Sequence, residues 1–367
     1  MLKKNLIALS PFCFATVMLL DDAEALNGID RSHILSTMDG TPVRLAPPVD
    51  AESTCRGKFG TPENVVFGGV GGSGIVGDIL SDYCRELTDI PVSICRSLTI
   101  PKFVDKRTLF VAISYSGETR ETLGQVIQAT KHRAPVIVVT SGGRLLSKAK
   151  GEGMPYLRIP LGLLPRLALP ELVAAAVFAM GSAGLLANTS KVLSDAANSL
   201  SERIGKVKQT VPSERNAAKK AAQALMDKLP LLIGDEGYGS VLRRFKNELN
   251  ENSKVPALCY TLPEGYHDDV EGISTLRKLS NPQPILLRTG TEAEGQKRTR
   301  EQLKRLFDEM GFSPVLEFEG EGKEKLSELL TAIMFADYVS VYLAAIRGVD
   351  PAELALIPKF RAAMSGE

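Results

Sequence analysis

Two short turns rich in glycine and hydroxyl side chains stand in the first third of this 367-residue chain. One is Gly68–Gly74 (Gly-Gly-Val-Gly-Gly-Ser-Gly) and the other is Ser114–Thr119 (Ser-Tyr-Ser-Gly-Glu-Thr), and each directly follows a short apolar run. Glycine lets a backbone approach a ligand closely, helix N-terminal N–H groups attract anions, and hydroxyl groups donate to phosphate oxygens. The two turns therefore predict one pocket for a phosphorylated small molecule.

Residues 69–74 also satisfy the pattern GxGxxG of dinucleotide-binding domains. Such a site uses an acidic residue about 20 positions further on to hold the ribose, whereas this chain has Ile94-Cys95-Arg96 there. A nicotinamide site would also leave the second turn without a role, and a pair of plain strand-to-helix turns is the remaining alternative. We therefore favour a phosphate site over a nicotinamide site.

The bulk composition is that of a globular protein, with 44% apolar and 24% charged residues and a formal net charge of +1. Positive and negative residues are interspersed, so the chain has no electrostatic footprint for nucleic acid or a membrane surface. Five cysteines lack CxxC spacing and three histidines are scattered, which argues against a disulfide framework and a metal cluster. We expect a cytoplasmic protein that binds a small molecule and uses no metal or cofactor.

The first residues resemble a signal peptide, because a charged and apolar stretch at 3–20 is followed by Ala23-Glu24-Ala25. Pro11 interrupts the apolar run, and Asp21-Asp22 precedes the possible cleavage site. We favour an upstream extension or a wrongly chosen start over export, with Met18 as an alternative start.

The elements that must position the two turns follow from apolar runs of strand length. Runs that alternate with helix-like segments predict a parallel sheet covered on both faces. A polar helical stretch separates them from a second such series, and a long apolar helix at 326–346 ends before Gly348. The predicted strands are 65–67, 92–95, 109–113, 136–139 and 156–159 in the first series, and 231–234, 285–287 and 315–318 in the second.

The predicted fold class is α/β, with two doubly wound parallel-sheet domains of the flavodoxin-like, three-layer α/β/α kind. The predicted organisation is an N-terminal extension or signal-like segment (1–18), an N-terminal domain (19–186), a helical connector (187–228), a C-terminal domain (229–348) and a C-terminal tail (349–367).

Several ordered motifs resemble known families. The two turns, Gly71-Gly72-Ser73-Gly74 and Ser114-Tyr115-Ser116-Gly117-x-Thr119, resemble the sugar isomerase (SIS) domain. More narrowly, Pro165-Arg166, Asn250–Lys254 and Pro263–His267 resemble the bifunctional phosphoglucose/phosphomannose isomerases of archaea and some bacteria. The resemblance extends from about residue 19 to the tail and includes Ile29-Asp30-Arg31-Ser32 and Arg347-Gly348-Val349-Asp350-Pro351.

This resemblance implies two SIS domains and an aldose–ketose isomerase that works through a cis-enediolate without metal or cofactor. The substrates would be glucose 6-phosphate or mannose 6-phosphate and fructose 6-phosphate. Glu251 would be the base, His267 would open the sugar ring from the neighbouring subunit of a homodimer, and Arg166 would stabilise the enediolate. A partly desolvated carboxylate, an imidazole and a fixed cation suit these three roles.

Each of these residues also has a structural alternative: a solvated carboxylate at a helix end, a structural histidine, or an arginine that caps a helix. The resemblance also implies a lysine in the C-terminal tail that contributes to the active site. Counted without gaps from Asp350-Pro351, the position of that lysine holds Arg361, and Lys359 is two residues away. The phosphate would bind at Gly71, Gly72, Ser73, Ser114, Ser116 and Thr119.

Two further positions depart from the family pattern. Glu118 stands where the family usually has asparagine, and a carboxylate beside a phosphate is repulsive unless it points away or meets a cation. Tyr266 and Asp268 replace the asparagines that commonly flank the histidine. Other functions thus stay open: an SIS isomerase for an amino sugar or a ketose phosphate of different length, or a non-catalytic sugar-phosphate sensor, although no DNA-binding module accompanies the domains.

Overall fold

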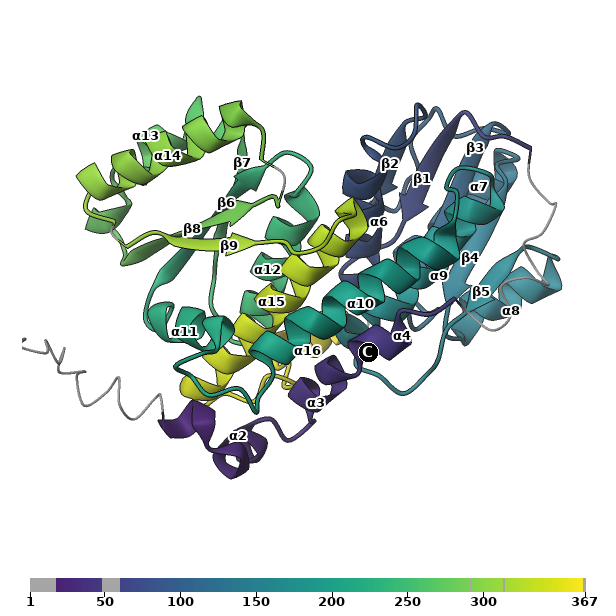
Figure 1. Cartoon of the computed structure of the whole chain (residues 1–367). Helices are drawn as coiled ribbons and strands as arrows, with labels where there is room; N and C mark the ends of the chain where they lie inside the picture. Colours follow the sequence, from purple (N-terminus) through teal and green to yellow (C-terminus); the bar gives the residue numbers. More distant parts are fainter. Residues whose placement is uncertain (1–17, 48–59, 291, 313, 366–367) are drawn as a thin grey trace, which may run out of the picture.

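A computed structural model describes residues 18–47, 60–290, 292–312 and 314–365 of the chain. Figure 1 shows two lobes, each built on its own sheet. The first sheet has the order β2-β1-β3-β4-β5, with every neighbouring pair parallel. All five strands predicted in this half are confirmed: β1 (Asn64–Gly68), β2 (Val92–Cys95), β3 (Thr108–Ser114), β4 (Val136–Thr140) and β5 (Tyr156–Arg158).

The second sheet repeats the order of the first four strands, as β7-β6-β8-β9, and is also parallel throughout. The predicted fold class of two doubly wound α/β domains is therefore confirmed. Strand β7 was not predicted, because it lies at the sheet edge with its first residues exposed and lacks a continuous apolar run. The strands are β6 (Leu229–Asp235), β7 (Leu258–Leu262), β8 (Pro282–Arg288) and β9 (Leu316–Glu319).

Both faces of each sheet are covered, which explains why the strands read as apolar runs. In β1, Val65 and Phe67 face the core shared with the inner helices, whereas Val66 faces the outer layer. That outer layer includes Val126 of α7 and Leu145 of α8. The helices of this lobe are α6 (Gly72–Cys84), α7 (Arg120–Lys131), α8 (Gly143–Gly151) and α9 (Leu169–Ser182), with the 3₁₀ turn η1 (Pro165–Ala168) before α9.

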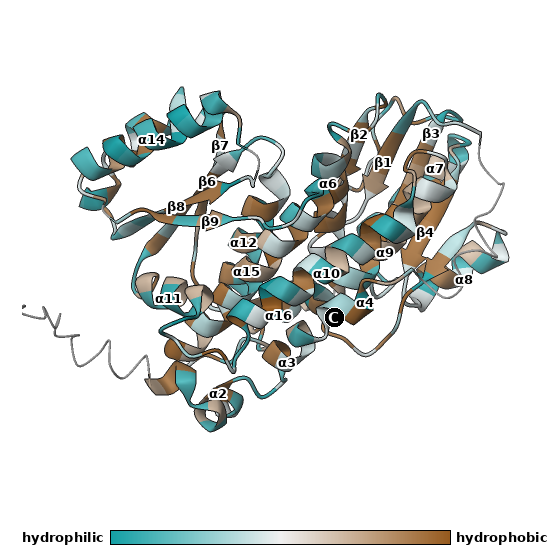
Figure 2. Ribbon diagram, in the orientation of Figure 1, coloured by the Kyte–Doolittle hydropathy of each residue, from teal (hydrophilic) through white to brown (hydrophobic). Residues whose placement is uncertain are grey.

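Helix α15 (Lys325–Ile346) lies between the two lobes, and every residue from Leu326 to its end is buried. Figure 2 shows its apolar surface within the molecule, in contrast to the polar outer helix α14. Among the described helices, α15 alone is long and apolar enough to cross a membrane, and its apolar window is wholly buried inside the fold. A single core thus extends from one sheet through α15 to the other.

The remaining helices frame these lobes. Helices α10 and α11 occupy the segment predicted as a helical connector, and α2, α3 and α4 precede the first sheet. Their bounds are α2 (Ala23–Ile29), α3 (Ile34–Asp39), α4 (Thr41–Arg44), α10 (Thr189–Val207), α11 (Ala217–Ala224), α12 (Gly239–Glu251), α13 (Asp269–Ile273), α14 (Glu294–Glu309) and α16 (Leu356–Ser365), with 3₁₀ turns η2 (Glu264–Tyr266) and η3 (Leu276–Lys278).

The start of the described chain is tied into the fold. Leu20 and Leu26 are fully buried. Asp21 accepts hydrogen bonds from the Nζ of Lys219 at 2.9 Å and from the backbone N–H of Ser213 at 2.8 Å. The predicted signal-like segment 1–18, apart from Met18, lies outside the described residues.

Candidate active site

The two predicted phosphate turns meet at the carboxyl edge of the first sheet. Strands β1 and β3 are neighbours and parallel, so the turns that follow them share one edge, as predicted. The Ser73 Oγ at the start of α6 accepts a hydrogen bond of 3.3 Å from the backbone N–H of Tyr115 in the second turn. Gly71 precedes α6 with a φ of 57°, in the region that favours glycine. The pairing of β1 with β3 therefore brings the two turns together.

The second turn is held in one shape by its own side chains. The hydroxyl groups of Ser114 and Thr119 lie 2.8 Å apart, and the Ser114 Oγ also accepts a hydrogen bond from the N–H of Gly117. Gly117 has a φ of 69°, and a methyl group on it would lie 1.9 Å from the carbonyl oxygen of Gly142. The Ser116 Oγ accepts from the N–H of Glu118. The turn thus packs tightly against the loop after β4.

Glu118, which departs from the family pattern, meets a cation. Its carboxylate accepts hydrogen bonds from the Nε of Arg144 at 2.6 Å and from the Arg144 backbone N–H at 2.8 Å. The hydrogen bonds from Arg144 hold the pKa of Glu118 below its ordinary value. Arg144 was not identified from the sequence, since only the need for some cation beside Glu118 was apparent there.

Arg166 and Glu251, which are 85 positions apart, lie beside each other. Arg166 stands on η1 with its side chain 5% exposed, and Glu251 is the last residue of α12 with its side chain 30% exposed. The Nη1 of Arg166 is 3.8 Å from the Oε2 of Glu251. A methyl group on Gly72 would lie 3.7 Å from the Cα of Arg166, so the glycine-rich turn adjoins this pair. A cation, a carboxylate and the glycine-rich turn therefore converge.

Other segments that carry the resemblance also meet here. The Arg31 Nε lies 3.1 Å from the Oδ2 of Asp350, and the carbonyl oxygen of Pro351 accepts a hydrogen bond of 2.7 Å from the Nη2 of Arg166. The Lys254 Nζ donates to the carbonyl oxygens of Glu251 and Asp350. Burial, and then the charge of Arg166, lower the pKa of Lys254.

His267, Lys359 and Arg361 are exposed in this structure. His267 follows η2 after the edge strand β7, and it is exposed beside the ring of Tyr266 at a centroid distance of 4.7 Å. Within the described part of the chain, it shares no hydrogen bond or ion pair with Arg166 or Glu251. Lys359 and Arg361 stand on the exposed helix α16.

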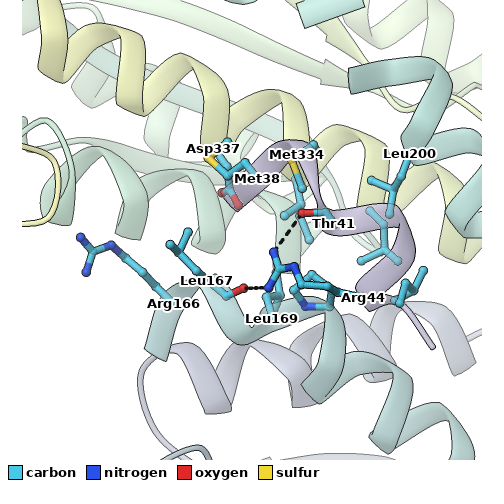
Figure 3. A pocket seen from close by; sticks show the side chains of 13 residues that line it. Met38, Thr41, Arg44, Arg166, Leu167, Leu169, Leu200, Met334 and Asp337 are labelled. Carbon is cyan, nitrogen blue, oxygen red and sulfur yellow. Dashed lines mark hydrogen bonds between the residues drawn. The ribbon is translucent and has the colours of Figure 1, made fainter. Parts of the chain in front are cut away.

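A small, mostly apolar cavity lies behind Arg166, between α4, α9, α10 and α15. Figure 3 shows that Arg44 donates hydrogen bonds to Thr41 and to the carbonyl oxygen of Leu167 there, while the guanidinium of Arg166 points away. Its lining is mostly aliphatic, so it does not suit a sugar phosphate. The candidate site lies on the opposite side of Arg166. Within the described ranges, no three His, Cys, Asp or Glu side chains are placed to hold a metal ion.

Comparisons with known proteins show the family of the chain. Residues 60–148 match the SIS domain family, and residues 214–364 match the bacterial phospho-glucose isomerase C-terminal SIS domain. The chain is 31% identical over 290 residues to a bifunctional phosphoglucose/phosphomannose isomerase of Caldicellulosiruptor bescii, which covers 79% of this chain and 86% of that protein. It is 28% identical over 305 residues to a D-glucosamine-6-phosphate 4-epimerase of Sulfolobus acidocaldarius, with 82% and 89% covered.

The fold has solved counterparts as well. A glucose-6-phosphate isomerase like protein from Thermus thermophilus superposes with a TM-score of 0.62 at 17% identity, over 93% of this chain and 98% of that one. At that identity the likeness concerns the fold alone. Sequence identity over most of both chains carries the assignment: this chain belongs to the family of bifunctional phosphoglucose/phosphomannose isomerases, which are enzymes built from SIS domains.

Proposed function

We propose that the protein interconverts glucose 6-phosphate or mannose 6-phosphate with fructose 6-phosphate, as a cytoplasmic homodimer with shared active sites. The observation that carries the proposal is the convergence of Arg166, Glu251 and the turn at Gly72. The Caldicellulosiruptor bescii relative is named a bifunctional phosphoglucose/phosphomannose isomerase, and this name supports the proposed substrates.

In the proposed reaction Glu251 is the base. The C–H bond at C2 of the open-chain aldose breaks, its electrons form the C1–C2 double bond, the π electrons of the C1 carbonyl move onto O1, and the proton passes to the carboxylate. The carboxylate then returns this proton to C1 while the hydroxyl proton of O2 moves to O1 and the C2 carbonyl forms, which yields the ketose. A side chain that is 30% exposed can reach a bound sugar and is still partly desolvated, as a general base requires.

Arg166 is the proposed stabiliser of the enediolate. Negative charge develops on a sugar oxygen when C2 loses its proton, and a fixed, buried cation lowers the energy of that state without reorganising. The phosphate would accept hydrogen bonds from the N–H groups of Gly71, Gly72 and Ser73. It would also accept them from the hydroxyl groups of Ser73, Ser114, Ser116 and Thr119, and the tail would contribute Lys359 or Arg361.

His267 is the proposed ring-opening residue, acting in the neighbouring subunit. It would give a proton to the ring oxygen and take one from the hydroxyl group at C1. Its exposure, and the absence of a hydrogen bond or ion pair with Arg166 or Glu251 within the described part of the chain, support a role across a dimer interface.

A coupled assay tests the function. Purified protein with fructose 6-phosphate is expected to form glucose 6-phosphate, mannose 6-phosphate or both. Because each step moves a proton or stabilises a negative oxygen, we expect turnover to survive a chelator. Glu251→Gln should lower kcat by about a thousandfold. The control variant Glu202→Gln, at an exposed residue of α10, should have the kcat of the wild type. Wild-type turnover by Glu251→Gln would contradict the mechanism.

Mixing the two inactive variants Glu251→Gln and His267→Ala tests the shared site. A mixed dimer contains one site with both residues intact, so random exchange should restore about a quarter of wild-type activity. No recovery, when mixed dimers are shown to form, would place His267 outside the partner's site.

A second candidate is different chemistry on another sugar phosphate. The Sulfolobus acidocaldarius relative named D-glucosamine-6-phosphate 4-epimerase favours it, as does the departure at Glu118. Turnover of glucosamine 6-phosphate without turnover of fructose 6-phosphate would select this candidate.

A further inference from the structure

The guanidinium of Arg166 is held on two sides by the protein. Its Nε donates a hydrogen bond of 2.9 Å to the Oδ1 of Asn252, and its Nη2 donates one of 2.7 Å to the carbonyl oxygen of Pro351. Only Nη1 is turned toward Glu251, at 3.8 Å. The direction of the cation is therefore set by its two acceptors.

The amide of Asn252 can face Arg166 in only one way. Its Nδ2 donates to the Oε2 of Glu248 and to the Oγ of Ser340, both at 2.9 Å. The Ser340 hydroxyl group donates its hydrogen to the carbonyl oxygen of Asp337, at 2.7 Å, so the Ser340 Oγ must accept a hydrogen bond from Asn252. Both amide hydrogens are thereby committed, and the amide oxygen must point at Arg166.

A buried arginine anchors the far end of this chain of hydrogen bonds. The Nη1 of Arg244 lies 2.8 Å from the Oε1 of Glu248, and two other nitrogens pair with Asp337. The Nη2 of Arg244 also donates to the backbone carbonyl oxygen of Arg166, at 3.0 Å. Arg244 thus fixes the main chain of Arg166, while Asn252 fixes its side chain, and all these groups are buried.

We propose that Asn252 is a positioning residue that aims the Arg166 guanidinium at the reacting oxygen and keeps it from closing onto Glu251. This inference rests on the proposed function, in which Arg166 is the stabiliser and Glu251 the base. Without the Asn252 oxygen, the buried Nε of Arg166 loses its acceptor, and the nearby carboxylate of Glu251 is the alternative partner. A closed ion pair would withhold both groups from the substrate.

The test is steady-state kinetics of Asn252→Ala, Arg166→Ala and the double variant. We expect Asn252→Ala to lower kcat about 10- to 100-fold, with KM within about threefold, because the loss concerns the transition state. The double variant should be no slower than Arg166→Ala, since Asn252 acts through Arg166. Asn250→Ala is the matched control, because the Asn250 amide lies on the exposed side of α12 and donates to the Lys246 carbonyl oxygen.

Asn252→Leu serves if the alanine variant does not fold. It has nearly the same shape, but it offers no acceptor to the Nε of Arg166, so a similar loss of kcat is expected. Wild-type kcat in either variant, or fully additive losses in the double variant, would overturn the positioning role. Wild-type turnover by Arg166→Ala or Glu251→Gln would instead refute the proposed function, so the two failures are distinguishable.

Discussion

The tight approach of Gly117 to Gly142 makes a quantitative test of the second phosphate turn. Alanine at position 117 would have to adopt a φ of 69°, which costs about 1 kcal/mol for a residue with a Cβ. Its methyl group would also lie 1.9 Å from the carbonyl oxygen of Gly142. Ordinary C···O contacts begin at about 3.3 Å, so the turn must shift by roughly 1.4 Å.

We expect Gly117→Ala to lower the free energy of unfolding by about 2–4 kcal/mol, as strain and overpacking add. A shift of this size at the proposed phosphate site should lower kcat/KM by about 100-fold. Urea unfolding followed by circular dichroism measures the first effect, and the isomerase assay measures the second.

Gly184 provides the matched control. It is exposed after α9 with a φ of 76°, and a methyl group on it would meet no atom within 4 Å. Gly184→Ala therefore carries the backbone strain without the clash, and should cost about 1 kcal/mol with unchanged kcat/KM. Equal stability losses in the two variants, or wild-type kcat/KM in Gly117→Ala, would refute the reasoning.

Three further predictions concern charged groups. Arg144→Ala leaves the Glu118 carboxylate beside the proposed phosphate turn without its cation, so KM for fructose 6-phosphate should rise several-fold. Adding Glu118→Gln should reverse this rise. An unchanged KM in Arg144→Ala would show that the Glu118 carboxylate does not repel the phosphate. Asp21→Ala removes the carboxylate partner of the buried Lys219 ammonium and should lower the free energy of unfolding by about 2 kcal/mol in urea titrations. Burial raises the pKa of Glu248, although Arg244 opposes this, so the stability from its protonated form is full below the ordinary pKa of 4.5 and is lost as pH rises through the raised pKa. Glu248→Gln should therefore gain stability relative to the wild type between pH 5 and pH 8, and a constant difference across that range would contradict the raised pKa.

Much of the fold could be predicted because the signals for it are local. The central strands β3 and β4 of the first sheet are short apolar runs, since a parallel sheet covered on both faces buries all of their side chains. Strand β7 lacks that signal because its first residues are exposed at the sheet edge. Glycines at 71 and 117 marked the turns because a positive φ excludes most other residues.

The chain by itself determined the two glycine- and hydroxyl-rich turns, the prediction of their common sheet edge, and the resemblance that singled out Arg166, Glu251 and His267. Only the tertiary structure decided which groups surround them: Arg144 beside Glu118, and Asn252 with Pro351 around Arg166. These partners lie 26 to 185 positions apart. Turns and strands depend on neighbouring residues and leave a periodic trace, whereas a hydrogen bond between distant segments depends on how whole elements pack, and it leaves none.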